Sequence, residues 1–255
     1  MDWAYTVSGF AVGMLVGLTG VGGGSLMTPL LILFGIPPVK AVGTDLLFAC
    51  ITKVGGVWVH GRRGTIDWRI VGLLAAGSLP ASLLTLWLLQ YLSAQGWKVD
   101  VLIVPLIGVA VILTAFALIF KAQLQRHPWF KSPTAGASLS ASTVVTGAVL
   151  GTLVTLTSIG AGAIGVVALF LLYPLIHTTK IVGSDIAHAV PLTLVAGLGH
   201  LGMGNVDFVL LGSLLLGSLP GIYLGSHMSV NIPEKVLRIA LASMLMLVGF
   251  RLIAH

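Results

Sequence analysis

A lysine in the middle of a long apolar segment is the residue of this chain most able to do chemistry. Lys53 lies between Thr52 and Val54, in a stretch with almost no other charge. An ionised lysine at the centre of a bilayer costs roughly 2.5–3.5 kcal/mol on insertion scales, so it should face a bundle interior and have a partner. That partner could be a substrate anion or a carboxylate of another helix. Asp45 shares its helical face but lies about 12 Å away along one helix, too far for direct pairing.

Two glycine-rich breaks could bind an anion through the backbone. The first is Gly20-Val21-Gly22-Gly23-Gly24 and the second is Gly160-Ala161-Gly162, and hydroxyl side chains lie beside each. A helix that begins at such a break exposes free N–H groups and about half a positive charge, and glycine lets a ligand come close. Two such starts facing each other would form an anion site, although the glycines could also serve only tight helix crossing. Our candidate substrate-binding residues are Thr19, Gly20, Gly22, Gly23, Gly24, Ser25, Lys53, Thr157, Ser158, Gly160 and Gly162.

Carboxylates and histidines within the apolar segments are candidates for coupling or gating. Asp45 and Asp185 hold equivalent positions near the starts of their segments, where they could cap a helix or relay a proton or cation. His188 is one turn from Asp185. Histidines at equivalent segment ends could titrate near neutral pH or serve only structure. The coupling or gating candidates are Thr44, Asp45, Ser184, Asp185, His188, His60 and His200.

Other chemistries lack their signatures. No Gly-Lys-Ser/Thr follows the glycine breaks and no strand precedes them, so they do not form a nucleotide-binding loop. Cys50 is the only cysteine, which excludes a disulfide framework and a cysteine zinc cluster. No histidine and carboxylate spacing resembles a metal-binding set, and no nucleophile has a base and an orienting group beside it. We therefore expect no enzyme activity, no metal and no cofactor.

The positions that carry these residues occur twice. When Val42 is laid over Val182 and that register is kept, the second half falls onto the first without a gap. Such duplication in an apolar chain indicates a transporter built from two repeats with a site between them. Proline within the third motif predicts a kink or hinge, or plain helix geometry. The matching motifs are Val42-Gly43-Thr44-Asp45 with Val182-Gly183-Ser184-Asp185, Gly64-Thr65-Ile66-Asp67 with Gly204-Asn205-Val206-Asp207, and Gly77-Ser78-Leu79-Pro80 with Gly217-Ser218-Leu219-Pro220.

Composition places these segments in a membrane. Apolar residues make up 57% of the chain and charged residues 8%, whereas a soluble domain has about 25% charged residues. We expect an all-α, multi-pass protein of the cell (plasma or inner) membrane with the lipid bilayer as partner. The net charge of +6 then marks cytoplasmic loops, not a nucleic-acid partner. The expected helical segments are 4–19, 24–36, 40–60, 67–91, 100–120, 138–158, 163–176, 180–201, 206–227 and 233–254. The first repeat covers 1–120, a polar cytoplasmic linker 121–137 and the second repeat 138–255.

The short segments decide the topology. Segments 24–36 and 163–176 each follow a glycine break and are too short to span comfortably, so each repeat begins with a kinked hairpin or a broken helix. If both members of each pair cross, or both re-enter, the repeats are inverted and the basic residues split nine inside to three outside. If each pair instead forms one long span, the repeats are parallel and the basic residues split seven inside to five outside. The positive-inside rule therefore favours inverted repeats. The spacing of Gly9, Gly13 and Gly17 predicts a close-packing face.

The motifs at the breaks resemble those of the sulfite exporter TauE/SafE family, over almost the whole chain. The resemblance implies a membrane permease for sulfur-containing anions such as sulfite, sulfoacetate or thiosulfate. The second glycine run is shorter, with Ala163 and Ile164 opposite Gly23 and Gly24, so the half-sites would contribute unequally. The residues that carry the resemblance are Gly17-Leu18-Thr19-Gly20-Val21-Gly22-Gly23-Gly24-Ser25, Pro29 and Ala41-Val42-Gly43-Thr44, with Thr157-Ser158-Ile159-Gly160-Ala161-Gly162 and Val182-Gly183-Ser184.

We therefore expect a secondary transporter of a small sulfur-containing anion (sulfite, thiosulfate or an organosulfonate) with alternating access around a site between the repeats. A coupled proton or cation would be a further partner, and the chain could form a homo-oligomer. With the cell interior at about −100 mV, a dianion is driven outward by about 4.6 kcal/mol, so import would need a coupled ion and export would not. The alternatives are an anion channel, and a permease for another small anion or a metal ion.

Overall fold

The computed structural model describes residues 3–19, 24–124, 137–228 and 234–253, and every regular element within them is an α-helix. The helices begin and end close to the predicted segments, so the prediction of an all-α chain is confirmed. Most of the predicted linker, 125–136, lies outside the described residues, and residues 121–124 continue helix α5. The helices are α1 (Trp3–Thr19), α2 (Gly24–Leu33), α3 (Pro38–Arg62), α4 (Trp68–Ala94), α5 (Val99–Leu124), α6 (Ala137–Thr157), α7 (Ala163–Leu172), α8 (Thr178–Gly202), α9 (Phe208–Met228) and α10 (Glu234–Ile253).

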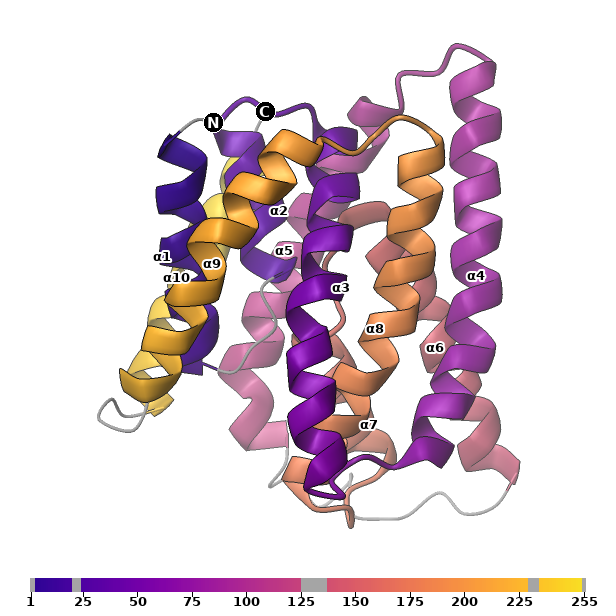
Figure 1. Ribbon diagram of the computed structural model, residues 1–255. Helices are drawn as coiled ribbons and strands as arrows, with labels where there is room; N and C mark the ends of the chain where they lie inside the picture. The colour runs from indigo at the N-terminus through magenta and orange to yellow at the C-terminus, as the bar shows by residue number, and fades with distance from the viewer. Residues whose placement is uncertain (1–2, 20–23, 125–136, 229–233, 254–255) are drawn as a thin grey trace.

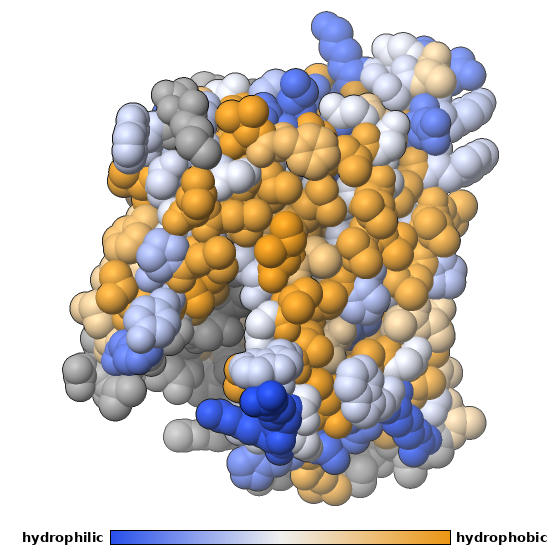
Figure 2. All heavy atoms as spheres, in the orientation of Figure 1, coloured by the Kyte–Doolittle hydropathy of each residue, from blue (hydrophilic) through white to orange (hydrophobic). Residues whose placement is uncertain are grey.

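Helix length and surface character both show a membrane protein. Six of the described helices, α3, α4, α5, α6, α8 and α9, are long and apolar enough to cross a bilayer. Helices α1, α7 and the end of α10 are apolar but shorter. Figure 2 shows hydrophobic side chains over the middle of the molecule and hydrophilic ones gathered at its upper and lower edges. The chain is therefore a multi-pass membrane protein, as its composition predicts.

The repeated Gly-x-x-Asp motifs start two of the long helices. The Asp67 carboxylate accepts the backbone amides of Arg69 at 3.2 Å and Ile70 at 3.4 Å, which caps α4. Asp207 does the same for α9 with the amides of Val209 and Leu210, both at 2.9 Å. A carboxylate at this position satisfies amides that the helix leaves without intrahelical partners.

Helices α3 and α8 form an antiparallel pair at the centre of the bundle. In Figure 1, α3 runs down from the edge at which both chain ends lie, and α8 runs up towards it. Helix α1 begins and α2 ends at this upper edge, whereas α6 begins and α7 ends at the lower one. The outer helices pack across the halves, since α1 lies on α9, α6 on α4, and α5 on α10.

Glycines allow the outer helices to touch backbone to backbone. Gly9 and Gly13 of α1 lie against the backbone of α9, and a methyl group added at either would overlap it. Gly147 and Gly151 of α6 lie against the backbone of α4 in the same way. The predicted close-packing face of α1 is therefore confirmed at Gly9 and Gly13.

These contacts correct the ungapped register in the first helix of each half. Gly13 lies against Ser218 and Gly151 lies against Ser78, and the two serines are equivalent residues of the repeated motif. Gly13 therefore corresponds to Gly151, whereas the ungapped register places it opposite Leu153. With this correction the two breaks are more alike than the ungapped alignment suggests. The corrected register matches Thr19 with Thr157, Gly22 with Gly160 and Gly24 with Gly162.

The Gly-Ser-Leu-Pro motif serves helix packing. Pro80 and Pro220 lie inside α4 and α9, and both helices continue past them. Gly77 and Gly217 of the motif lie against the backbones of α6 and α1. The glycine of the motif is therefore a point of backbone contact between crossing helices, in helices that are continuous at the proline.

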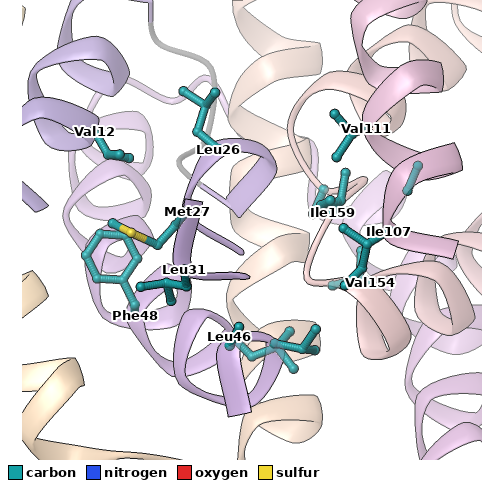
Figure 3. Packing of buried hydrophobic residues seen from close by; sticks show 14 of the residues in the cluster. Val12, Leu26, Met27, Leu31, Leu46, Phe48, Ile107, Val111, Val154 and Ile159 are labelled. Atoms are coloured by element: carbon teal, nitrogen blue, oxygen red, sulfur yellow. The ribbon is translucent and has the colours of Figure 1, made fainter. Parts of the chain in front are cut away.

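The largest buried apolar cluster joins the two halves. It includes Met27 and Leu31 of α2 and Phe48 of α3, together with Val154 of α6 and Ile159 of the break after it (Figure 3). The short helix α2 is thus held by apolar contacts against α3 and the second-half break. This packing brings the end of α6 and the start of α7 to the middle of the molecule.

Candidate functional site

Lys53 is buried and binds the opposite half of the chain. Only 8% of its surface is exposed, and its Nζ donates a hydrogen bond of 3.1 Å to the carbonyl of Ala161, in the break between α6 and α7. It also interacts electrostatically with the carboxylates of Asp185 and Asp45. Among the described residues, no carboxylate lies within ion-pair distance of it. Lys53 thus faces the interior of the bundle, as expected, but its hydrogen-bond partner is a backbone carbonyl and not the substrate anion or carboxylate that the sequence suggested.

Asp45 and Asp185 are both fully buried, but they are bound differently. Asp45 Oδ2 accepts a hydrogen bond of 2.6 Å from the Thr28 hydroxyl of α2, and the carboxylate also interacts with Ser158. Asp45 Oδ1 has no hydrogen-bond partner. Asp185 interacts with the Gly162 amide and with Lys53, yet neither of its oxygens has a partner in hydrogen-bond geometry. Asp185 is therefore the less satisfied carboxylate.

Each carboxylate lies against the start of a short helix. Asp45 contacts Thr28, one turn into α2, and Asp185 contacts Gly162, the residue before α7. Gly165 in the first turn of α7 is so close to Asp185 that a methyl group there would overlap the carboxylate. The N-terminus of a helix attracts anions. At α7 the protein's own Asp185 carboxylate thus lies where the sequence predicted a substrate anion.

His188 completes a polar cluster on one side of the midplane. Its Nε2 shares a hydrogen bond of 2.8 Å with the Ser78 hydroxyl of α4, while its buried Nδ1 has no partner. Helices α3 and α8 each have 25 residues. At 1.5 Å per residue, Lys53, Asp185 and His188 lie about 10–15 Å from the lower ends of these helices, and Asp45 about 10 Å from the upper end. Lys53 is therefore at the depth of Asp185.

The second-half break is an ordered, irregular segment. The Thr157 hydroxyl donates to the Leu153 carbonyl at 2.7 Å and accepts the Ile159 amide at 3.1 Å, so it terminates α6. Ser158 has a positive φ of 59°, which is uncommon for a residue with a side chain, and its hydroxyl is buried near the Asp45 carboxylate. Gly160 and Gly162 also have positive φ, at 126° and 121°. Of the predicted residues of this break, Ser158 lies near the Asp45 carboxylate and Gly162 near the Asp185 carboxylate, while Lys53 binds Ala161 between them.

The first-half break is outside the described residues. This applies to Gly20, Gly22 and Gly23, and to the side chains of Thr19 and Ser25. Gly24 is the first residue of α2. The expected roles of these residues in binding remain predictions.

Four coupling or gating candidates bind groups other than Lys53 and the two buried carboxylates. The Thr44 hydroxyl accepts the Asp207 amide at 3.1 Å, and the Ser184 hydroxyl accepts the Asp67 amide at 2.8 Å. His60 shares a hydrogen bond of 2.8 Å with the Thr65 hydroxyl, and His200 Nε2 lies 3.0 Å from the Thr155 carbonyl. These four residues bind neighbouring loops and helix ends.

Sequence reasoning missed three groups that bind the buried polar residues: the Thr28 hydroxyl, which binds Asp45, the Ser78 hydroxyl, which binds His188, and the Ala161 carbonyl, which binds Lys53. Ser78 lies in the repeated Gly-Ser-Leu-Pro motif, whose recurrence was a usable signal. Thr28 follows the first break by one turn, a position from which a hydroxyl can face it. The carbonyl of Ala161 has no side-chain signature and could not have been found.

The side chains of Lys53, Asp45, Asp185 and His188 are buried in this conformation. Two cavities of about 570 and 590 Å³ lie at the upper edge, and Asp100 and Val101 line both. Neither is lined by Lys53, Asp45, Asp185 or His188. In the described parts of the chain, no three His, Cys, Asp or Glu side chains come together as a metal site.

A helical membrane bundle that buries a lysine, two aspartates and a histidine between its halves has the architecture of a membrane transport protein, because intramembrane charges usually mark substrate or ion pathways. Comparison with known proteins agrees with this class. The chain belongs to the sulfite exporter TauE/SafE family, whose model matches residues 5–252.

Relatives named as transporters cover the chain almost end to end. A probable membrane transporter protein, YjnA of Bacillus subtilis, is 39% identical over 99% of this chain and 100% of its own length. YdhB, a probable membrane transporter protein of the same organism, is 30% identical over 91% and 92%. One from Methanocaldococcus jannaschii is 29% identical over 95% and 92%. No solved structure matches the chain.

Proposed function

We propose that the protein is a secondary transporter of a small sulfur-containing anion, such as sulfite, thiosulfate or an organosulfonate, in the cell membrane. The observation that carries this proposal is the buried Lys53, whose ammonium group binds the break of the opposite half. Burying a cation at that depth costs free energy, and such residues usually belong to the pathway of an ion or a substrate. The family assignment supports a sulfur anion as the cargo.

The substrate would bind between the two breaks. Lys53 and the backbone amides at Gly160 and Gly162 would face its oxygens, with Ser158 as a further donor. Thr157 would hold the break in shape, since its hydroxyl is already used in ending α6. The first-half break would contribute Thr19, Ser25 and the glycines between them.

We propose that the halves are inverted repeats. The antiparallel α3 and α8, and the exchange of α1 and α6 onto α9 and α4, support this arrangement. Cys50 Sγ lies 3.8 Å from the carbonyl of Val190, its equivalent in the second half, near the middle of both helices. Such a pair is expected close to a two-fold axis in the membrane plane.

The lower edge would face the cytoplasm. It carries Arg62, Arg63, Arg69 and Lys180, whereas the described upper edge carries Lys40, Lys98 and Arg251. The positive-inside rule favours this orientation.

Gating would take place at the equivalent hydrogen bonds of Thr44 and Ser184 with the loops before α9 and α4. At the lower edge Lys180 Nζ also lies 3.7 Å from the Asp67 carboxylate. In the described residues, the corresponding Lys40 and Asp207 form no ion pair. The additional contact suggests that the lower gate is the more firmly closed in this conformation.

The function is tested in proteoliposomes by counterflow of labelled thiosulfate against unlabelled sulfite, thiosulfate, isethionate, sulfate and chloride. A transporter gives saturable uptake that trans substrate stimulates. Linear uptake without trans-stimulation would indicate a channel. Absence of uptake with every sulfur anion would contradict the proposed cargo.

A further inference from the structure

We propose that Asp185, and not Asp45, takes up one proton whenever the substrate anion binds, so that anion and proton cross the membrane together. The proposal rests on the proposed function and specifies how its site handles charge. The proton comes from solvent and forms an O–H bond to one carboxylate oxygen. The O–H bond of the donating hydronium ion breaks and leaves water, and no other bond forms or breaks.

The buried ammonium group of Lys53 needs a counter-ion. When the site is empty, the nearest charge of opposite sign at its depth is the Asp185 carboxylate, which also faces the amide of Gly162 at the start of α7. A substrate anion needs the same ammonium and the same helix start. Two anions competing for one cation in a buried site repel each other strongly. Protonation of Asp185 removes its charge and leaves both groups to the substrate.

Hydrogen bonding distinguishes the two aspartates. Asp45 is held by the Thr28 hydroxyl at 2.6 Å and is associated with Ser158. Both oxygens of Asp185 are buried without a partner in hydrogen-bond geometry. Hydrogen bonds to the charged form of a carboxylate favour that form. Asp185 has no side-chain donor in hydrogen-bond geometry, so it loses less on protonation than Asp45, which accepts from the Thr28 hydroxyl.

The neighbours of the two aspartates also favour Asp185 as the proton carrier. His188 follows Asp185 by three residues, whereas Phe48 follows Asp45 by three and lies in the apolar cluster with Met27 (Figure 3). Lys53 belongs to the Asp185 side by depth, and the residue equivalent to it in the second half is Thr193, which binds its own helix at the Ala189 carbonyl. The ionisable side chains of Lys53 and His188 are therefore on the side of Asp185.

Few other ionisable groups face Asp185. The helices that pack on α8 are α3, α4, α6 and α7. Helices α6 and α7 contain no ionisable side chain, and α4 has only Arg69 and Tyr91 near its ends, while its Ser78 binds His188. Helix α3 supplies Lys53, with Asp45 and Cys50 further along and His60 near its end. On α8 itself, His188 is one turn away, and Lys180 and His200 lie towards its ends. His188 is therefore the main competitor as proton carrier.

Proton uptake can be counted directly with isethionate, a sulfonate that carries one negative charge at any working pH. Isothermal titration calorimetry of the purified protein in buffers of different ionisation enthalpy gives the protons bound per anion. We expect about one for the unmodified protein, about one for Asp45→Asn and close to none for Asp185→Asn. The affinity of the unmodified protein should fall about tenfold per pH unit above the pKa of the carrier, and that of Asp185→Asn should not.

Transport provides the second readout. Proteoliposomes containing a trapped pH dye should acidify as isethionate enters, and Asp185→Asn should exchange isethionate without acidification. A proton count of zero in the unmodified protein overturns the proposal even if the variants do not fold, and so does an unchanged count in Asp185→Asn, which would point to His188. Saturable, trans-stimulated counterflow with no proton uptake overturns the coupling alone and leaves the proposed function standing. Absence of counterflow and binding with every sulfur anion overturns both.

Discussion

The backbone amide of Asp67 donates a hydrogen bond of 2.8 Å to the hydroxyl of Ser184, in the other half of the chain. The equivalent bond joins the Asp207 amide to the Thr44 hydroxyl at 3.1 Å. Each bond fixes the loop that starts one outer helix onto a central helix of the opposite half. Residues far apart in sequence are thus connected at both edges of the molecule.

We expect Ser184→Ala to lower the free energy of unfolding by about 1 kcal/mol or somewhat more, because the Asp67 amide loses its acceptor. Denaturant unfolding in detergent measures the change. Ser213→Ala is the matched control: the Ser213 hydroxyl is buried but donates only to the Val209 carbonyl of its own helix, so its loss should matter less. Equal effects of the two substitutions would contradict a special role for Ser184.

The glycine contact between α4 and α6 should not accept a methyl group. Gly151→Ala would push Cβ into the backbone at Ser78, and we expect a loss of about 1–3 kcal/mol through overpacking. Gly72→Ala, on an open face of α4, should cause no loss, because nothing lies within contact distance of a methyl group there. Thermal unfolding of the two variants beside the parent protein checks this. A stable Gly151→Ala protein would mean that the two helices are further apart than described.

Lys53→Gln should weaken sulfur-anion binding by tenfold or more while leaving the fold intact. Glutamine keeps an N–H donor on a side chain one atom shorter, so the substitution removes the charge while leaving a polar group near the Ala161 carbonyl. Thr193→Val, at the equivalent position of the second half, should leave affinity nearly unchanged. Binding of thiosulfate and isethionate by calorimetry provides the measurement. Unaltered affinity in Lys53→Gln would remove this residue from the site.

The proposed orientation can be read from single cysteines in whole cells. Cys50 is the only native cysteine and is buried, so Cys50→Ser gives a suitable background. With a membrane-impermeant maleimide, Gln95→Cys at the upper edge should be labelled in intact cells. Arg63→Cys at the lower edge should be labelled only after permeabilisation. The reverse pattern would invert the topology.

Burial of Lys53 could be predicted from one residue and its neighbours, because an ammonium group in a long apolar helix is costly wherever that helix packs. Its partner could not be predicted, because the Ala161 carbonyl lies in the opposite half of the chain and has no side-chain signature. The Ser78 hydroxyl, which binds the distant His188, lay in a recurring motif that predicted only a kink or plain helix geometry. Contacts of this range depend on how the helices cross.

The sequence by itself determined the class of protein, the helices and their approximate ends, because hydropathy, glycine breaks and capping carboxylates act over a few residues. Only the tertiary structure decided that Gly13 of α1 corresponds to Gly151 of α6, that Asp45 is held by the Thr28 hydroxyl while Asp185 has no side-chain donor, and that the loops bind across the halves. The physical reason is that burial in a membrane is imposed on each segment separately. The pairing of polar groups inside the bundle, in contrast, is settled only when distant helices come into contact.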